Sequence, residues 1–181
     1  SDESRGLGDV YKRQLMNKLF KNNSEFNKSS PVKLSSHHLL AIEGMQKTEI
    51  QKLLDRADYF ANLDKHADTK YLSGYVVLNV FFENSTRTRV SFELAARRLG
   101  AEVINISLIN SSIKKGESLL DTASTLNAMK PDLLIVRHPH SGAPLLFAEY
   151  LSCSIINAGD GRHEHPTQAL LDALTIKRRI G

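Results

Sequence analysis

The chain has 181 residues, 41% of them hydrophobic, which is enough for one ordinary domain with a buried core and excludes disorder by composition. The net charge of +4 is mild and no aromatic-interleaved basic patch accompanies it, so nucleic-acid binding is disfavoured. No run approaches the roughly 20 apolar residues of a membrane span. The single cysteine, Cys153, excludes an internal disulfide, and we expect it to be buried at the start of a strand.

The beginning of the chain does not have the pattern of a folded segment. Residues 1–14 have no initiating Met and no hydrophobic periodicity, and they are interpreted as a non-native leader. Residues 15–36, rich in Lys, Asn and Ser, are expected to form a loose arm. The folded domain is therefore expected to occupy residues 37–181.

Hydrophobic periodicity predicts the elements of this domain in chain order. Apolar residues recur at helical spacing over 47–65, with Thr48 and Gln51 as a predicted capping box. The nearly continuous apolar run 75–82 is typical of a strand buried on both faces. The remaining pattern predicts helices at 86–99, 118–129, 144–151 and 166–180, strands at 103–107, 132–137 and 154–157, and a polar loop at 108–117.

This alternation of strands and helices predicts an α/β fold, with a four-stranded parallel sheet and helices on both faces. In such sheets, ligands bind beyond the carboxyl ends of the strands. Polar residues that follow a predicted strand are therefore the first candidates for a functional site.

The turn Glu83–Arg89 follows the first predicted strand and opens a helix. A helix N-terminus offers unpaired amides, three hydroxyl side chains stand in the turn, and the guanidinium of Arg87 matches a phosphate group. The alternative is an ordinary Ser/Thr cap followed by solvated arginines. The position at the end of a buried parallel strand favours a phosphate site.

The last predicted helix opens with His165-Pro166-Thr167-Gln168. His165 and Gln168 are three residues apart and share a face, where an imidazole can donate to a carbonyl oxygen and a carboxamide can pair with an amide. A capping histidine and a surface glutamine are the alternative. A metal site built on His163 and His165 is disfavoured because no third ligand stands at a diagnostic spacing.

Two further segments are less specific when taken alone. Arg137 ends the strand predicted at 132–137. There it either faces the ligand crevice beyond the carboxyl ends of the strands or forms a surface ion pair. The loop Ser111–Glu117 is polar and contains two lysines, which by itself indicates only a solvated connection.

Together these segments resemble the transcarbamoylase family, in order and spacing, from about Leu39 to Gly181. Ser85–Arg89 resembles the family's phosphate-binding signature, and His165–Gln168 resembles its second signature. The loop Ser111–Glu117 and the segment Val136–Pro139 are similar to the aspartate branch of the family rather than to the ornithine branch.

The resemblance implies a role for each of these residues. The phosphate of carbamoyl phosphate would be bound by Ser85, Thr86, Arg87 and Thr88, its carbonyl oxygen by Arg137, His165 and Thr86, and its NH2 group by Gln168. Ser111, or alternatively Ser112, and Lys115 would reach the site of a neighbouring subunit, which makes a homotrimer the smallest active unit. Glu83 would hold the arginines rather than react.

The resemblance also implies the reaction. A carbamoyl group would pass from carbamoyl phosphate to the amine of L-aspartate, giving N-carbamoyl-L-aspartate and phosphate for pyrimidine biosynthesis in the cytoplasm, with no metal ion or organic cofactor. Charge on the carbonyl oxygen would be stabilised by His165, Arg137 and Thr86, with Arg87 receiving the phosphate.

The family's aspartate-binding domain is expected to be absent from this chain, which alone is expected to be inactive. A regulatory subunit is left open. The alternatives are another amine acceptor, such as ornithine, and a non-catalytic assembly partner. The presence of Arg87, Lys115, Arg137, His165 and Gln168 disfavours the latter.

Overall fold

The computed structural model describes residues 34–64, 67, 69–108 and 118–180. The predicted leader, most of the predicted arm and most of the predicted 108–117 loop lie outside these residues. The elements along the chain are α2 (Lys47–Ala61), β1 (Val76–Phe81), α3 (Thr86–Arg98), β2 (Glu102–Ser107), α4 (Leu119–Ala128), β3 (Leu133–His138), α5 (Ala143–Tyr150), β4 (Ser154–Asp160) and α6 (Pro166–Ile180).

The four strands form one parallel sheet in the order β2-β1-β3-β4, which confirms the predicted fold class. From β1 the chain moves outward to β2 and then crosses back to β3 on the other side of β1. The change of direction places a topological switch point between the carboxyl ends of β1 and β3, where sheets of this kind bind ligands.

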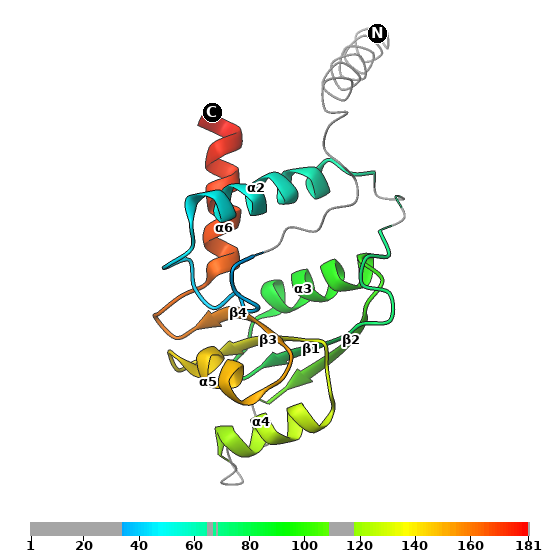
Figure 1. Cartoon of the computed structure of the whole chain (residues 1–181), viewed down its shortest axis with the longest axis vertical. Helices are drawn as coiled ribbons and strands as arrows, with labels where there is room; N and C mark the ends of the chain where they lie inside the picture. Colours follow the sequence, from blue (N-terminus) through cyan, green and yellow to red (C-terminus); the bar gives the residue numbers. More distant parts are fainter. Residues whose placement is uncertain (1–33, 65–66, 68, 109–117, 181) are drawn as a thin grey trace, which may run out of the picture. The chain divides into compact units, whose positions relative to one another are not determined.

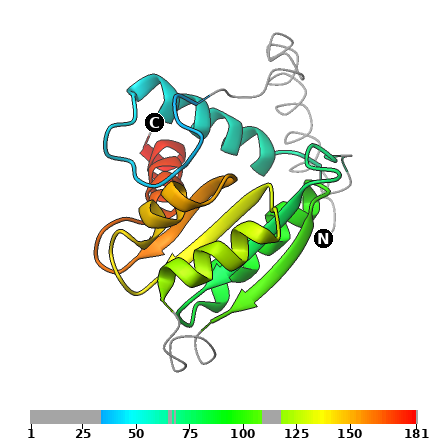
Figure 2. The same ribbon diagram turned by 60° about the horizontal axis from the view of Figure 1, so that its bottom comes forward.

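Helices cover both faces of the sheet, with α3 on one face and α4 and α5 on the other (Figures 1 and 2). Alternate residues of each central strand point to opposite faces, so β1 contributes Leu78 and Val80 to one core and Val77 and Phe81 to the other. Burial on both faces explains why β1 has a nearly continuous apolar sequence.

At the other edge of the sheet, α6 packs against β4 and lies beside α2 (Figures 1 and 2). Two ion pairs join these helices, Lys177 with Asp55 at 2.9 Å and Arg178 with Asp58 at 2.6 Å. All four side chains are substantially exposed, so these ion pairs contribute little to stability. In the described ranges, no helix has both the length and the apolar character needed to cross a membrane.

Some boundaries differ from the prediction. Helix α2 ends at Ala61, where the Asn62 side chain donates to the carbonyl of Asp58, rather than at residue 65. The predicted capping box was wrong. The helix is capped by Gln46, whose backbone amide donates to Glu49 Oε2 at 3.2 Å.

The fourth strand, β4, extends three residues beyond its predicted end at residue 157. Its pairing with β3 contains an irregularity, since Val136 pairs with Asn157 but His138 pairs with Asp160. Two residues of β4 therefore lie opposite the single residue Arg137, which makes this a β-bulge.

The prediction for Cys153 is confirmed. The residue is buried immediately before β4, and burial raises the pKa of its thiol. A buried neutral thiol of this kind behaves as a small hydrophobic side chain.

Candidate functional site

The turn after β1 forms the N-terminus of α3. Ser85 is the N-cap residue, but its side chain makes no capping hydrogen bond. Thr86 and Arg87 are exposed, while Ser85 and Thr88 are half-buried. Because the first amides of a helix have no partner within it, both these amides and the Ser85 hydroxyl are available to an anion.

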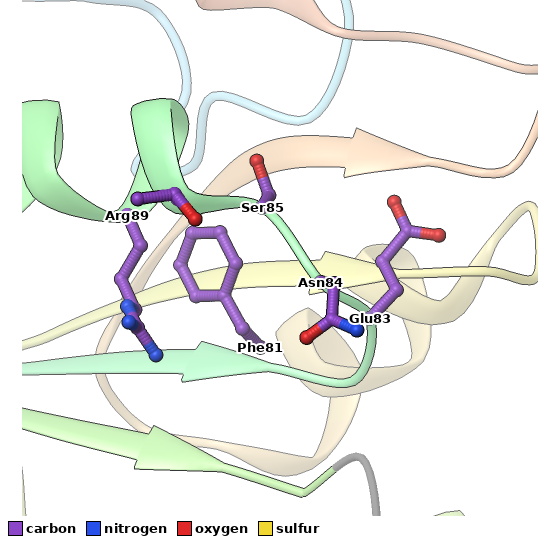
Figure 3. A pocket seen from close by; sticks show the side chains of 6 residues that line it. Phe81, Glu83, Asn84, Ser85 and Arg89 are labelled. Atoms are coloured by element: carbon purple, nitrogen blue, oxygen red, sulfur yellow. The ribbon is translucent and has the colours of Figure 1, made fainter.

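A small pocket lies at this turn (Figure 3). The pocket is lined by Phe81, Glu83, Asn84, Ser85, Thr86 and Arg89. The ring of Phe81 lies between Arg89 on one side and Asn84 and Glu83 on the other, so an apolar floor separates two polar walls. The sequence placed Arg89 within the signature Ser85–Arg89 but gave it no binding role of its own, although its spacing of three from Thr86 places both on one face of the helix.

Arg137 lies at the end of β3 and is held by two acceptors. Its Nε donates to Glu83 Oε1 at 2.6 Å, and its Nη1 donates to the carbonyl of Ala158 at 3.1 Å. The Arg137 and Glu83 side chains are 24% and 34% exposed, so the ion pair is partly shielded from water. The arginine thus joins the ends of β1, β3 and β4.

His165 lies immediately before α6, close to Arg137. Burial, and then the positive charge of Arg137, lower the pKa of His165, so the ring is neutral near pH 7. The Thr167 hydroxyl lies 3.3 Å from His165 Nδ1. A hydroxyl that donates to Nδ1 leaves the proton of a neutral imidazole on Nε2, where it can be donated to a substrate oxygen.

Gly159 is the residue that allows Arg137 and His165 to lie so close to the sheet. A Cβ added to Gly159 would lie 2.7 Å from Arg137 Nη1 and 3.4 Å from His165 Cδ2. Its φ of +114° also disfavours any residue with a side chain. A larger residue would therefore displace the guanidinium, the imidazole or both.

The remaining predicted site residues have different outcomes. The side chain of Gln168 donates to Asp172 Oδ1 at 2.9 Å, along its own helix, rather than standing free. Ser111, Ser112 and Lys115 lie outside the described residues. Among the residues whose positions are described, no group of three or more His, Cys, Asp or Glu side chains is arranged to hold a metal ion.

The chain matches a protein-family model. The model of the aspartate/ornithine carbamoyltransferase carbamoyl-P binding domain matches residues 37–178. The aspartate carbamoyltransferase catalytic subunit of Dinoroseobacter shibae is 62% identical over 152 residues, which cover 82% of this chain and 48% of that protein. The catalytic subunit of Rhodospirillum rubrum is 62% identical over 146 residues, covering 80% of this chain and 46% of that protein.

Solved structures give the same result. The catalytic subunit of M. jannaschii aspartate transcarbamoylase is 46% identical with a TM-score of 0.74, covering 81% of this chain and 48% of that chain. Aspartate transcarbamoylase of Trypanosoma cruzi in complex with carbamoyl phosphate is 37% identical with a TM-score of 0.77, covering 87% of this chain and 52% of that chain. The chain spans about half the length of the curated relatives it matches.

Proposed function

The chain belongs to the aspartate/ornithine carbamoyltransferase family, and from that premise we propose that it is the carbamoyl-phosphate-binding part of an aspartate carbamoyltransferase catalytic chain. The proposed reaction transfers the carbamoyl group of carbamoyl phosphate to the amine of L-aspartate, giving N-carbamoyl-L-aspartate and phosphate. The product would enter pyrimidine biosynthesis in the cytoplasm. Aspartate is preferred to ornithine as the acceptor because relatives that are about 60% identical carry that name.

The observation that carries the proposal is the position of Arg137. It lies at the switch point between β1 and β3, held by Glu83 and Ala158 and close to a neutral His165. An arginine and a neutral imidazole fixed side by side are two preorganised donors that can act on one substrate oxygen. Their fixed geometry avoids reorganisation while charge develops on that oxygen.

The phosphate end of the substrate would occupy the N-terminus of α3. In the proposal, Ser85, Thr86 and Thr88 donate through hydroxyls or amides, and Arg87 adds a planar guanidinium. The free Ser85 hydroxyl supports this placement, because the residue is not consumed in capping its own helix. Phosphate then leaves into a site that already stabilises its charge.

The carbonyl end would face Arg137, His165 and Thr86. As the amine of aspartate attacks the carbamoyl carbon, negative charge grows on the carbonyl oxygen, where these donors stabilise it. The departing phosphate would accept the amine proton. Gln168 would bind the NH2 group after exchanging its present contact with Asp172. Holding two substrates together supplies much of the remaining acceleration.

The proposal includes an assembly. Lys115, with Ser111 or Ser112, would enter the site of a neighbouring subunit, so that a homotrimer is the smallest active unit. Aspartate itself would be bound largely by the part of the relatives' length that this chain does not span.

The test uses the full-length product of the gene. Carbamoyl phosphate is supplied with aspartate or with ornithine, and carbamoyl aspartate and citrulline are measured. Arg87→Ala should reduce turnover by roughly 100-fold or more, since a charged donor to the phosphate is lost. Arg97→Ala, which removes an exposed guanidinium paired with Glu93 on α3, is the matched control and should leave turnover unchanged.

The products separate the candidate functions. Carbamoyl aspartate that disappears in Arg87→Ala but not in Arg97→Ala supports the proposal. Citrulline would assign the chain to the ornithine branch. A folded assembly that makes neither product would favour the non-catalytic partner.

A further inference from the structure

Asp160, the last residue of β4, is a buried carboxylate that the proposed reaction does not use, only 2% exposed. Its Oδ2 accepts a hydrogen bond from the Gly142 amide at 2.7 Å, and its Oδ1 accepts from Asn157 Nδ2 at 2.9 Å and from the Glu164 amide at 3.1 Å. Burial opposes ionisation, but these hydrogen bonds and the nearby His163 outweigh it and lower the pKa of Asp160. A charged carboxylate is therefore fixed at the end of the sheet.

The two amide donors belong to different segments of the chain. Gly142 closes the loop after β3, and the end of β3 carries Arg137. Glu164 lies directly before His165, in the turn that opens α6. Through one side chain, Asp160 thus joins the segment that carries the arginine to the segment that carries the histidine.

Backbone contacts show how closely these two segments meet. The Gly161 amide donates to the carbonyl of His138 at 3.0 Å. A Cβ added to Gly161 would lie only 2.8 Å from the carbonyl oxygen of Pro139. The segments are in backbone contact, so a shift of one of them moves the other.

Asn157 extends the network to the site itself. Its Nδ2 donates to Asp160 Oδ1 and its Oδ1 accepts from the Gly159 amide at 2.8 Å. Gly159 is the residue against which Arg137 and His165 lie. The orientation of Asp160 is thereby linked, through two hydrogen bonds, to the surface on which both donors rest.

We propose that Asp160 is a positioning residue for carbamoyl transfer, holding the Arg137 and His165 segments in register without touching the substrate. The inference rests on the function proposed above. A carboxylate suits this role because it accepts from two amides and a carboxamide at once. An asparagine in its place would turn an NH2 group toward at least one of those donors.

Asp160→Asn keeps the size of the side chain and removes this match. In the variant, the His165 ring loses its fixed, buried position beside Arg137, so its pKa should rise toward the ordinary value. Nuclear magnetic resonance titration of the 181-residue chain measures this shift. In the full-length product of the gene, kcat should fall about 100-fold, as expected for a small misplacement of catalytic groups. The KM for aspartate should change much less.

Asp132→Asn is the matched control. Asp132 Oδ2 also accepts from a backbone amide, that of Val76, at 2.7 Å, but at the amino end of the strands, away from the candidate site. This variant makes the same chemical change at an exposed carboxylate that accepts from a backbone amide. Asp132→Asn should leave the His165 pKa and kcat unchanged even if it lowers the melting temperature. This result separates positioning from general stability.

Gly142→Ala tests the same contact from the donor side if Asp160→Asn does not fold. The added methyl would meet nothing within 4 Å, and the φ of +84° strains the backbone that holds the amide toward Asp160. We expect a smaller rise of the His165 pKa and a severalfold fall of kcat.

The outcomes distinguish this inference from the proposed function. The positioning role alone is overturned if the wild type is active and Asp160→Asn changes neither the His165 pKa nor kcat. If Asp160→Asn does not fold, the same result in Gly142→Ala overturns it. Wild type that forms no carbamoyl aspartate overturns both. A shifted pKa and a reduced kcat, with Asp132→Asn normal, support the inference.

Discussion

The guanidinium of Arg137 and the carboxylate of Glu83 meet across the carboxyl ends of β3 and β1, with Nε 2.6 Å from Oε1. Glu83 accepts a hydrogen bond from Nε, and the carbonyl of Ala158 accepts one from Nη1. The pair fixes the direction of Arg137 before any substrate arrives. Burial, and then the positive charge of this guanidinium, lower the pKa of the nearby His165.

Arg137→Gln should affect catalysis and His165 together. Losing one donor to the developing oxyanion is expected to reduce kcat by roughly 100- to 1000-fold in the full-length product of the gene. The pKa of His165 should rise, because the neighbouring positive charge is gone. Arg178→Gln breaks the exposed ion pair with Asp58 and should change neither quantity. An unchanged His165 pKa in Arg137→Gln would contradict the electrostatic link.

Two serines at helix N-termini should respond differently to alanine. Ser118 Oγ accepts from the Asp121 amide at 3.2 Å, so Ser118→Ala should lower the free energy of unfolding by about 1 kcal/mol. The Ser85 side chain caps nothing, and Ser85→Ala should cost much less stability. Carbamoyl-phosphate affinity should fall only in Ser85→Ala. Urea denaturation measures the stability of both variants, and a titration measures their affinity for carbamoyl phosphate. Equal losses of stability in the two variants would contradict this prediction.

Acid should destabilise the domain before its carboxylates are protonated. The pKa values of His138 and His165 are lowered, in both cases mainly by burial. Below about pH 6.5 these histidines take up protons in the unfolded chain but not yet in the folded one, so the free energy of unfolding falls with falling pH. The fall stops once the pH passes the folded pKa values.

Urea denaturation from about pH 8 to about pH 5 measures this effect. His165→Gln should remove the part of the slope that belongs to His165 and leave the part that belongs to His138. A stability that is constant across the interval would show that the two rings titrate alike in both states.

The 181-residue chain alone should form no carbamoyl aspartate. It spans about half the length of the catalytic subunits it matches. In the function proposed above, aspartate is bound largely by the remainder. Carbamoyl phosphate should bind weakly, and the phosphorus resonance of the ligand reports that binding. Sustained production of carbamoyl aspartate by this chain would refute the division of the two substrates between two halves.

Much of the fold follows from periodicity because the central strands are buried on both faces. The apolar run of β1 and the turn that follows it were predicted within one residue. The end of β4 was missed because Gly159 and Asp160 are poor strand formers. Tertiary contacts, namely pairing with β3 and the hydrogen bonds of Asp160, keep them in the strand.

The site was predicted less completely than the fold. Strand-end reasoning located Arg137 and the turn at Ser85, and the structure brings Arg137 and His165 together. The contact of Gln168 with Asp172 was not foreseen, because a glutamine at that position can bind a ligand or donate to a carboxylate one turn along its own helix. The sequence assigned no separate role to Asp160, because the spacing of a lone carboxylate after a strand does not reveal its hydrogen-bond partners.

The bulge opposite Arg137 restricts how β4 can change. The length of the strand between Asn157 and Asp160 is fixed, because this stretch must lie opposite Arg137 and also hold the turn that opens α6. Deleting one residue there would restore regular pairing with β3 and turn the following side chains to the opposite face. Insertions and deletions in this short stretch should therefore be far less tolerated than substitutions, even where the sheet itself would gain regularity.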